Sequence, residues 1–507
     1  MKNSIISIIL IIFIGTQFQS CTNLDETTYS SITTDNFFKN EEEVVMNVGR
    51  AYAYLVQYTH YFNIWGALLI SSDEAICPYR ETNLWWDNGV WVDLHRHNFS
   101  PTLDNTNTAW SFIFEGVSLC NQIIYQLQES KVDFETKPNL MAEVKVLRAW
   151  FYLNAVDLFG NVPLSTDFAN TELPKQSTRK EVFDFVESEI KANVDLLDKA
   201  PTSQNYGRAT QAMAYTILAK LYINAKEWTG TAMWQETIDA CDKVIGFGTL
   251  SLEPDYFDNF TVNNQGSSEN IFVILYDNVY TSKEWDSTLK FHQYTLHTLS
   301  QQTFNIVDFC WDGFCATEDF YNSFSDNDKR KKMWLVGPQY SATGQPLMLS
   351  STRQLNYRPK VKSLYNPQDP ALLDDGARFA KYEFESGLSG SMSNDYVVYR
   401  YADILMMKGE ALVRLGKADE ALPFFNTVRE RAGLSDYKSS DLTLSEILAE
   451  RGREFAWEGL RRQDLIRFGK WNDAWFEKSA DSEHTKLFPI PYWALDTNPN
   501  LVQNPEY

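Results

Sequence analysis

The sequence predicts a mainly α-helical fold: a degenerate tetratricopeptide-like helical-repeat scaffold that carries long irregular loops and a few short β-strands. Three observations support this fold class. Apolar residues recur at steps of three and four in several segments, which is the period of a helix that buries one face. One segment shows two such helices joined by a short turn, and long stretches rich in Gly, Pro, Asn and Asp separate the helical blocks. A regular repeat period is not sustained along the chain, so a plain solenoid is not expected.

Two long segments have the clearest single-helix pattern. Segment 142–160 keeps helical spacing of its apolar residues and stops at Gly160, before Asn-Val-Pro. Segment 209–228 has the same period, with alanines at positions where a neighbouring helix can approach closely. Both segments are therefore predicted to be packed helices of the scaffold.

A helical hairpin is predicted within residues 401–434. Its first helix runs to Leu415, the chain turns at Gly416, and a second helix begins near Ala418. The short turn and the small residues at set positions are typical of a tetratricopeptide repeat. Segment 217–245 is a weaker copy with a longer turn.

Two irregular regions, about 60–107 and about 250–395, lie between the helical blocks. Loops of this length are uncommon in compact domains unless they serve a function. Within the second region, residues 270–275 ("NIFVIL") are predicted to form a short strand. The chain is thus expected to present two elaborated surfaces on a rigid helical frame.

The N-terminus has the pattern of an export signal. The apolar stretch 5–14 is too short to cross a hydrocarbon layer about 30 Å thick. Ser20-Cys21 follows, which resembles a bacterial lipoprotein box, although Phe18 stands where Leu is usual. Cys21 is therefore predicted to be the lipidated first residue of the mature chain. The alternative is ordinary cleavage near Ser20 that leaves Cys21 unmodified.

Charge and cysteine content exclude several classes of function. The chain has 45 basic and 67 acidic residues, a net charge of −22, which opposes binding to nucleic acid or to anionic lipid through a basic patch. An acidic surface favours a neutral ligand over an anionic one. Beyond Cys21 the cysteines are sparse and lack a zinc-binding C-x-x-C pair. Cys310 and Cys315 either close a small loop as a disulfide or remain buried free thiols.

Four blocks of the sequence resemble recurring blocks of SusD/RagB-type proteins, in the order that the family has them. The blocks are "RAWFYLNAVDLFGNVPL" (148–164), "VYRYADILMMKGEAL" (398–412), "EILAERGREFAWEGLRRQDLIRFGKW" (446–471) and "LFPIPYWALDTNPNLVQNPEY" (487–507). The resemblance implies a surface-exposed outer-membrane lipoprotein with a helical-repeat core. It also implies a non-catalytic protein that binds oligosaccharides or other nutrients and docks on a SusC-like TonB-dependent transporter. No cofactor is expected.

The expected organisation follows from the signal, the composition and the resemblance. It divides the chain into a signal peptide (1–20), a lipid-anchored tether (21–40), a SusD-like N-terminal helical region with a ligand loop (41–250) and a SusD/RagB C-terminal region (251–507). The last region comprises a loop-rich insertion (251–395) and a helical repeat with an extended tail (396–507). The 446–471 block is expected to be a salt-bridged packing helix in which Arg453, Glu454, Glu458 and Arg462 pair at three- and four-residue spacing.

An aromatic loop is the main functional signal. Residues 82–91, "TNLWWDNGVW", place Trp85, Trp86 and Trp91 among turn-forming residues. An indole can cover the C–H face of a pyranose ring, while Asp, Asn, Arg or Gln side chains bind the hydroxyls at its edge. Segment 71–91 contains both kinds of residue, so the loop suits a sugar ligand.

The same segment resembles the carbohydrate-binding loop of glycan-binding family members. By that resemblance the ligand residues are Asp73, Arg80, Trp85, Trp86, Asn88, Tyr294, Trp311 and Asp312. Asp312 stands where the family often has Asn, which affects the expected hydrogen bond at the sugar edge. Of the two consecutive indoles, one is expected to pack beneath the loop. Asp73 and Arg80 either contact the ligand or pair with each other.

Other residues of this region have structural interpretations. Trp91 precedes an apolar helical start and is expected in the core. His95 and His97 have a spacing that a metal could use, but no third ligand is evident, so both are expected to be hydrogen-bonded loop residues.

Two other functional classes remain as alternatives to a glycan binder. A secreted glycoside hydrolase needs two carboxylates that face each other across the bond it cleaves, and Asp73 and Glu74, adjacent in an extended loop, would point apart. Nucleophile, metalloprotease and nucleotide-binding motifs are absent from the sequence. A helical-repeat scaffold for protein partners is the second alternative.

Overall fold

The computed structural model describes residues 38–82, 85–281 and 287–507. The predicted signal peptide, the predicted lipidation site Cys21 and most of the predicted tether lie outside the described residues. Across the part that is described, every helix is too short or too polar to span the hydrocarbon layer of a membrane.

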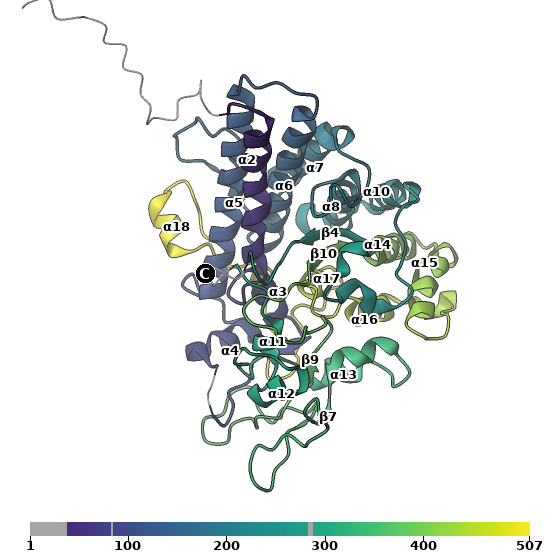
Figure 1. The fold of residues 1–507 in the computed structure, drawn as a ribbon. Coiled ribbons are helices and arrows are strands. Elements are labelled where there is room, and N and C mark those ends of the chain that lie inside the picture. The colour runs from purple at the N-terminus through teal and green to yellow at the C-terminus, as the bar shows by residue number, and fades with distance from the viewer. Residues whose placement is uncertain (1–37, 83–84, 282–286) are drawn as a thin grey trace, which may run out of the picture.

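Helices dominate the fold, as the sequence predicts (Figure 1). The first half contains α2 (Glu41–Tyr54), α3 (Ile64–Ile70), α4 (Val90–His95), α5 (Asp104–Glu129), α6 (Lys137–Leu158), α7 (Arg179–Asn193), α8 (Gln211–Ile223), α9 (Ala225–Thr229) and α10 (Trp234–Gly246). The second half contains α11 (Phe291–Thr295), α12 (Gln301–Phe304), α13 (Glu318–Asn322), α14 (Tyr401–Arg414), α15 (Ala418–Arg431), α16 (Leu444–Glu454), α17 (Arg461–Arg467) and α18 (Tyr492–Thr497).

The long helices pack in series, as expected for a degenerate repeat scaffold. The main contacts are α5 with α6, α6 with α7, α8 with α10, α10 with α14 and α14 with α15. The α14–α15 hairpin confirms the prediction for 401–434, and its turn depends on Gly416, whose φ of +78° suits glycine. The prediction of one helix over 209–228 was wrong, because the chain breaks at Asn224 into α8 and α9.

The strands are short and form two-stranded antiparallel pairs in the described residues. The pairs are β1 (Ala75–Ile76) with β5 (Cys315–Ala316), β2 (Val162–Pro163) with β3 (Gln176–Ser177), β4 (Asn270–Ile274) with β10 (Tyr396–Arg400), β6 (Trp334–Leu335) with β9 (Arg378–Phe379), and β7 (Gly337–Pro338) with β8 (Asn356–Tyr357). β4 confirms the predicted strand. The β1–β5 pair brings the two irregular regions together, in the register Ile76 to Cys315.

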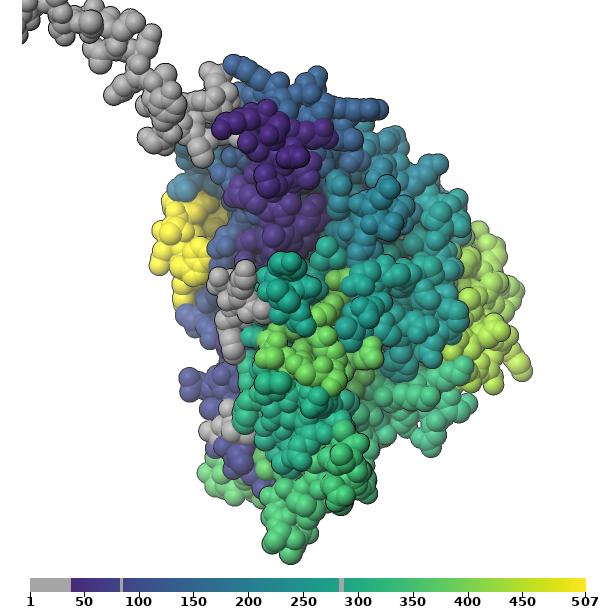
Figure 2. Space-filling model, in the orientation of Figure 1, coloured from purple at the N-terminus to yellow at the C-terminus, as the bar shows by residue number. Residues whose placement is uncertain are grey.

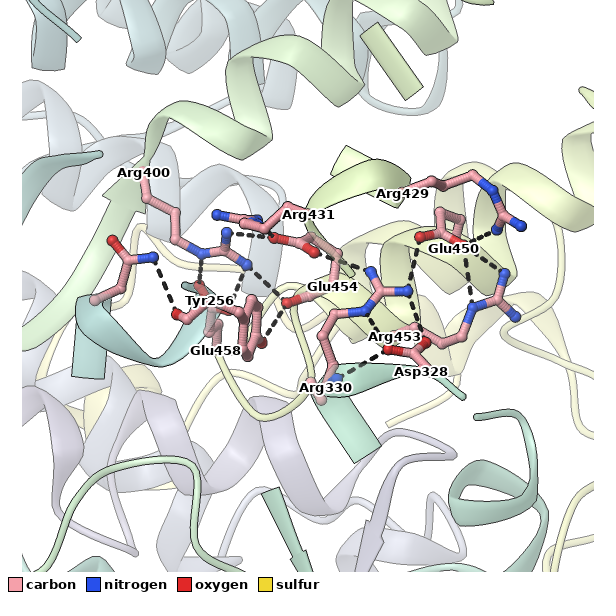
Figure 3. Close-up of polar contacts among 12 residues, drawn as sticks. Tyr256, Asp328, Arg330, Arg400, Arg429, Arg431, Glu450, Arg453, Glu454 and Glu458 are labelled. Atoms are coloured by element: carbon pink, nitrogen blue, oxygen red, sulfur yellow. Dashed lines mark hydrogen bonds and ion pairs between the residues drawn. The ribbon is translucent and has the colours of Figure 1, made fainter. Parts of the chain in front are cut away.

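A buried ion network joins the C-terminal helices to the loop-rich region (Figure 3). Glu454, at the end of α16, is fully buried and pairs with three arginines of other segments: Arg330, Arg400 and Arg431. Glu458 pairs with Arg400 and with Lys381. The expected helical pairing within 446–471 is therefore largely wrong, because the block is two helices and its charges mainly bind distant segments.

The structure also shows the ion-pair partners of Arg453 and Arg462 and the state of two cysteines. Arg453 does pair along its helix, with Glu450 three residues away, whereas Arg462 pairs with Asp157 of α6. Cys310 and Cys315 are both buried free thiols. The disulfide alternative is thus not the one that the structure adopts.

Candidate functional site

The aromatic loop changes direction directly after Trp86. Asp87, Asn88 and Gly89 have φ values of 45°, 53° and 91°, and these residue types tolerate the left-handed region best. The turn leads into α4, and the Trp91 Nε1–H donates to Asp87 Oδ2 at 3.0 Å. Trp91 is buried, which confirms its predicted place in the core.

The two consecutive indoles, Trp85 and Trp86, are both partly exposed but pack against different clusters. Trp86 stacks on Tyr365, with ring centroids 4.7 Å apart and planes inclined by 13°, and Tyr79 meets its edge at 5.0 Å. We call Tyr79, Trp86 and Tyr365 the Trp86 stack. Tyr365 covers one face of Trp86, so at most the opposite face can receive a ligand.

The other indole belongs to a group that we call the Trp311 cluster: Tyr61, Trp85, Tyr294, Trp311 and Phe314. The Trp85 and Trp311 rings are 5.0 Å apart at 68°, and the Tyr61 ring lies 5.2 Å from Trp85 and 5.7 Å from Trp311 at steep angles. Tyr61, Trp85 and Trp311 are partly exposed, whereas Tyr294 and Phe314 are buried beneath them. Edge-to-face packing holds the three partly exposed rings in fixed orientations.

Backbone hydrogen bonds hold Trp311 in this position. Its N–H donates to the Gln293 carbonyl at 2.8 Å, and the Phe314 N–H donates to the Tyr294 carbonyl at 2.7 Å. Gly313, between them, lies against the indole of Trp85. A Cβ at this glycine would be 2.0 Å from Trp85 Cε3 and 3.0 Å from the Tyr294 carbonyl oxygen.

We therefore expect Gly313→Ala to displace Trp85 and to lower the free energy of unfolding by about 1–3 kcal/mol, as overpacking does. Urea unfolding followed by near-ultraviolet circular dichroism measures both effects. Gly266→Ala is the matched control, because a Cβ there meets nothing within 4 Å and Gly266 is exposed. Equal stability and equal aromatic spectra for the two variants would contradict the proposed packing.

Three predicted ligand residues are buried, so their side chains do not form the expected surface contacts. Arg80 donates to the backbone carbonyls of Asp312, Gly313, Leu372 and Asp375. The Asp312 carboxylate pairs with Arg378 at 2.7 Å and lies 3.8 Å from Arg80. Tyr294 is 1% exposed beneath the indoles. In this structure the three side chains are buried in the protein interior.

Two predicted polar residues are at the surface but in different surroundings. Asn88 is exposed at the turn beside Trp86. Asp73 does not pair with Arg80; it forms a bidentate ion pair with Arg461, with both contacts at 2.7 Å. Asp73 also lines a separate cavity of about 230 Å³, together with Phe320 and Trp475.

The histidines and Glu74 have structural partners. His97 bridges the Asp481 carboxylate and the Ser71 carbonyl, and His95 contacts the Phe476 carbonyl. Burial lowers the pKa of each imidazole to about 4.

Burial raises the pKa of Glu74 to about 8, and its carboxyl accepts a hydrogen bond from the backbone N–H of Trp457. Glu74 therefore does not face Asp73 across a cleft. The described residues hold no cluster of three or more metal-ligating side chains.

Sequence reasoning missed two aromatic members of the site. Tyr61 follows His60 at the start of the first irregular region and packs against both Trp85 and Trp311. Tyr365 precedes "NPQDP" and forms the base of the Trp86 stack. Both are aromatic residues in turn-rich segments, the same pattern that singled out Trp85, and this pattern could have identified them.

Family comparisons agree with this architecture. A model of the SusD family matches residues 216–507, more than half of the chain. The chain belongs to the SusD family. A second family model, described as starch-binding and associating with the outer membrane, matches residues 22–223. SusD-family proteins bind carbohydrate and are not enzymes, so this chain is not an enzyme.

Individual relatives are distant but cover most of the chain. The starch-binding protein SusD of Bacteroides thetaiotaomicron is 24% identical over 463 residues, 83% of this chain and 82% of that protein. SusD-like protein P38 of Formosa agariphila is 23% identical over all of this chain and 99% of its own length. A solved surface glycan-binding protein A from Bacteroides thetaiotaomicron, in complex with laminarihexaose, is 23% identical with a TM-score of 0.75, over 92% of this chain and 100% of that one. This structural likeness confirms the fold.

Proposed function

We propose that this SusD-family chain binds an oligosaccharide or polysaccharide on the partly exposed rings of the Trp311 cluster. The observation that carries the proposal is the arrangement of Trp85, Trp311 and Tyr61, which lie within 5.0–5.7 Å of one another on irregular segments above a helical frame. Rings fixed at steep angles suit a curved or flat sugar chain whose C–H faces displace water from them. The starch and laminarihexaose named for relatives support the ligand class.

The Trp86 stack and Asn88 extend the proposed site. The partly exposed Trp86 can offer a second aromatic plane on the face that Tyr365 does not cover, and the exposed Asn88 amide can bind sugar hydroxyls beside it. The net charge of −22 favours a neutral glycan. Single shallow contacts with hydrated sugars are weak, so a long repeating glycan is held through rebinding at several positions.

Affinity electrophoresis tests this function. The purified chain is run in native gels that contain a neutral α-glucan, a β-glucan or a uronic-acid polymer, and we expect retardation in a neutral glucan. A reducing-end assay with the same polymers should stay flat, because the chain does not cleave them. No retardation in any polysaccharide would contradict the proposal.

The proposed setting is the outer membrane. One family model associates such proteins with that membrane, and Ser20-Cys21 supplies a lipidation site for a surface-exposed anchor. The captured glycan would pass to a SusC-like TonB-dependent transporter on which the chain docks. Co-purification of a transporter with the tagged chain from outer membranes tests that partnership.

Lipidation predicts the behaviour of Cys21→Ser. Without the thiol no acyl chain can be attached, so we expect the variant to leave the membrane fraction for the soluble fraction on cell fractionation. Cys120→Ser is the control, because that thiol is buried in α5 and should leave membrane association unchanged. Continued membrane attachment of Cys21→Ser would argue against a lipid anchor at this residue.

A further inference from the structure

A groove apart from the aromatic loops borders α2, which is purple on the face shown in Figure 2. It is a groove of about 720 Å³ between α2, the Tyr206–Arg208 turn and β4 with the residues that follow it. None of the residues of the Trp311 cluster lines it. The volume is within the range of pockets that take small molecules, roughly 300–1,000 Å³.

The walls of this groove are mostly aliphatic, although Tyr52, Tyr206 and Tyr280 also line it. Val48 of α2 and Leu55, which directly follows α2, line it together with Leu140, Ile274 and Leu275. Leu275 stays 46% exposed at the rim, which leaves apolar surface in contact with water. Most of the lining is apolar, so an alkyl chain would gain free energy from burial here, whereas most of a sugar's hydroxyls would lose hydrogen bonds to water.

One charged side chain lines the groove among the described residues, namely Arg208. Its Nε and Nη2 donate to the buried Glu143 carboxylate at 3.0 and 2.5 Å. The third guanidinium nitrogen, Nη1, makes no hydrogen bond to a described residue, and the Arg208 side chain is 36% exposed. The nearby Tyr52 hydroxyl already donates to Glu143 and accepts from the Ala209 N–H. The Nη1 group of Arg208 is thus a hydrogen-bond donor in the lining of a mostly apolar groove.

We propose that this groove binds an amphiphile, an aliphatic carboxylate whose chain lies along α2 and whose head accepts a hydrogen bond from Arg208 Nη1. The ligand is chemically distinct from the glycan, and the site is separate from the Trp311 cluster. The chain would therefore carry two binding sites with different ligand chemistry. The inference does not depend on the proposed glycan function.

Calorimetric titration of the purified chain with sodium octanoate, decanoate and dodecanoate tests the proposal. Burial of each added methylene group should tighten binding by about fourfold, so dodecanoate binds most tightly. Dodecyltrimethylammonium has the same chain but no acceptor and a like charge to Arg208. We expect it to bind at least tenfold more weakly than dodecanoate.

Two glycines provide a matched pair of variants. Gly49 lies on α2 in the groove wall, is exposed, and a Cβ there meets nothing within 4 Å, so Gly49→Leu adds an apolar side chain at the wall of the groove. Gly246, at the end of α10, is also exposed with nothing within 4 Å of a Cβ, and it does not line the groove. Gly49→Leu should weaken dodecanoate binding at least tenfold, while Gly246→Leu should leave it unchanged.

The outcomes separate the proposal from its alternatives. Affinity that does not change with chain length, equal binding of the cationic amphiphile, or wild-type dodecanoate binding by Gly49→Leu would each overturn it. Retardation of Gly49→Leu in the glucan gel should equal that of the wild-type chain. A loss of both ligands in that variant would show that the groove and the glycan site are not separate, which also contradicts the proposal.

Discussion

Trp311→Ala is expected to weaken glycan binding at least tenfold, about 1.4 kcal/mol or more, which is typical of an aromatic anchor at the centre of an interface. The substitution removes the ring that packs against Trp85 and Tyr61 and takes away a sugar-stacking plane. Trp86→Ala should have a smaller effect, because Tyr365 covers one face of Trp86. Retardation in polysaccharide gels, followed by calorimetry with an oligosaccharide, measures the difference.

The control for this prediction is Trp493→Ala. Trp493 is 47% exposed on α18, which lies well apart from α4 and α11 in Figure 1. Its removal should leave binding unchanged. If Trp86→Ala abolishes binding while Trp311→Ala does not, the ligand occupies the Trp86 stack and our assignment of the main platform is wrong.

Arg330→Met is expected to lower the free energy of unfolding by about 3–5 kcal/mol at neutral pH, because it leaves buried carboxylates without their counter-charge. Arg330 is fully buried and contacts Asp328, Glu450 and Glu454, each at 2.9 Å (Figure 3). Urea unfolding at constant m-value measures the loss. Lys180→Met, in an exposed pair with Asp184, is the control and should change stability by less than about 1 kcal/mol.

The same network predicts a dependence on pH. Although burial opposes it, the pairing with Arg330 and Arg453 lowers the pKa of Glu450 to about 2, and arginines also lower the pKa of Glu454. A carboxyl group whose pKa is lowered by folding stabilises the fold at pH values above its ordinary pKa near 4.5. This contribution is lost as the pH falls through the pKa of the folded state. The stability difference between wild type and Arg330→Met should therefore narrow from pH 5 towards pH 2. A difference that is constant over this window would contradict the assigned role of the network.

The parts of the fold that depend on local sequence could be predicted. The helical spacing of apolar residues and the turn at Gly416 define the α14–α15 hairpin. Both signals involve residues that are close together in the sequence, so they could be recognised there. The break at Asn224 interrupts a continuous apolar pattern and has no strong breaker residue, so the sequence did not reveal it. The ion network was missed because Arg330 and Glu454 are 124 positions apart.

The candidate site shows the same division. Aromatic residues in a turn-rich segment pointed to the region, and the Asp-Asn-Gly turn after Trp86 follows from residue type. The orientation of each indole side chain could not be predicted from the sequence. It depends on packing against distant residues, Tyr365 for Trp86 and Gly313 for Trp85. Arg80 was expected at a ligand because its segment resembles the carbohydrate-binding loop of the family, and such a resemblance does not fix the direction of the side chain. Its carbonyl partners come from residues 312 to 375, more than 230 positions away.

A crystal structure of the chain with an oligosaccharide, taken from the polysaccharide that retards it most, tests the central claim most directly. We expect a sugar ring in van der Waals contact with the indole of Trp311 or Trp85, and no cleavage of the oligosaccharide. Clear density for the sugar at another place, with both indoles uncovered, would contradict the proposed site.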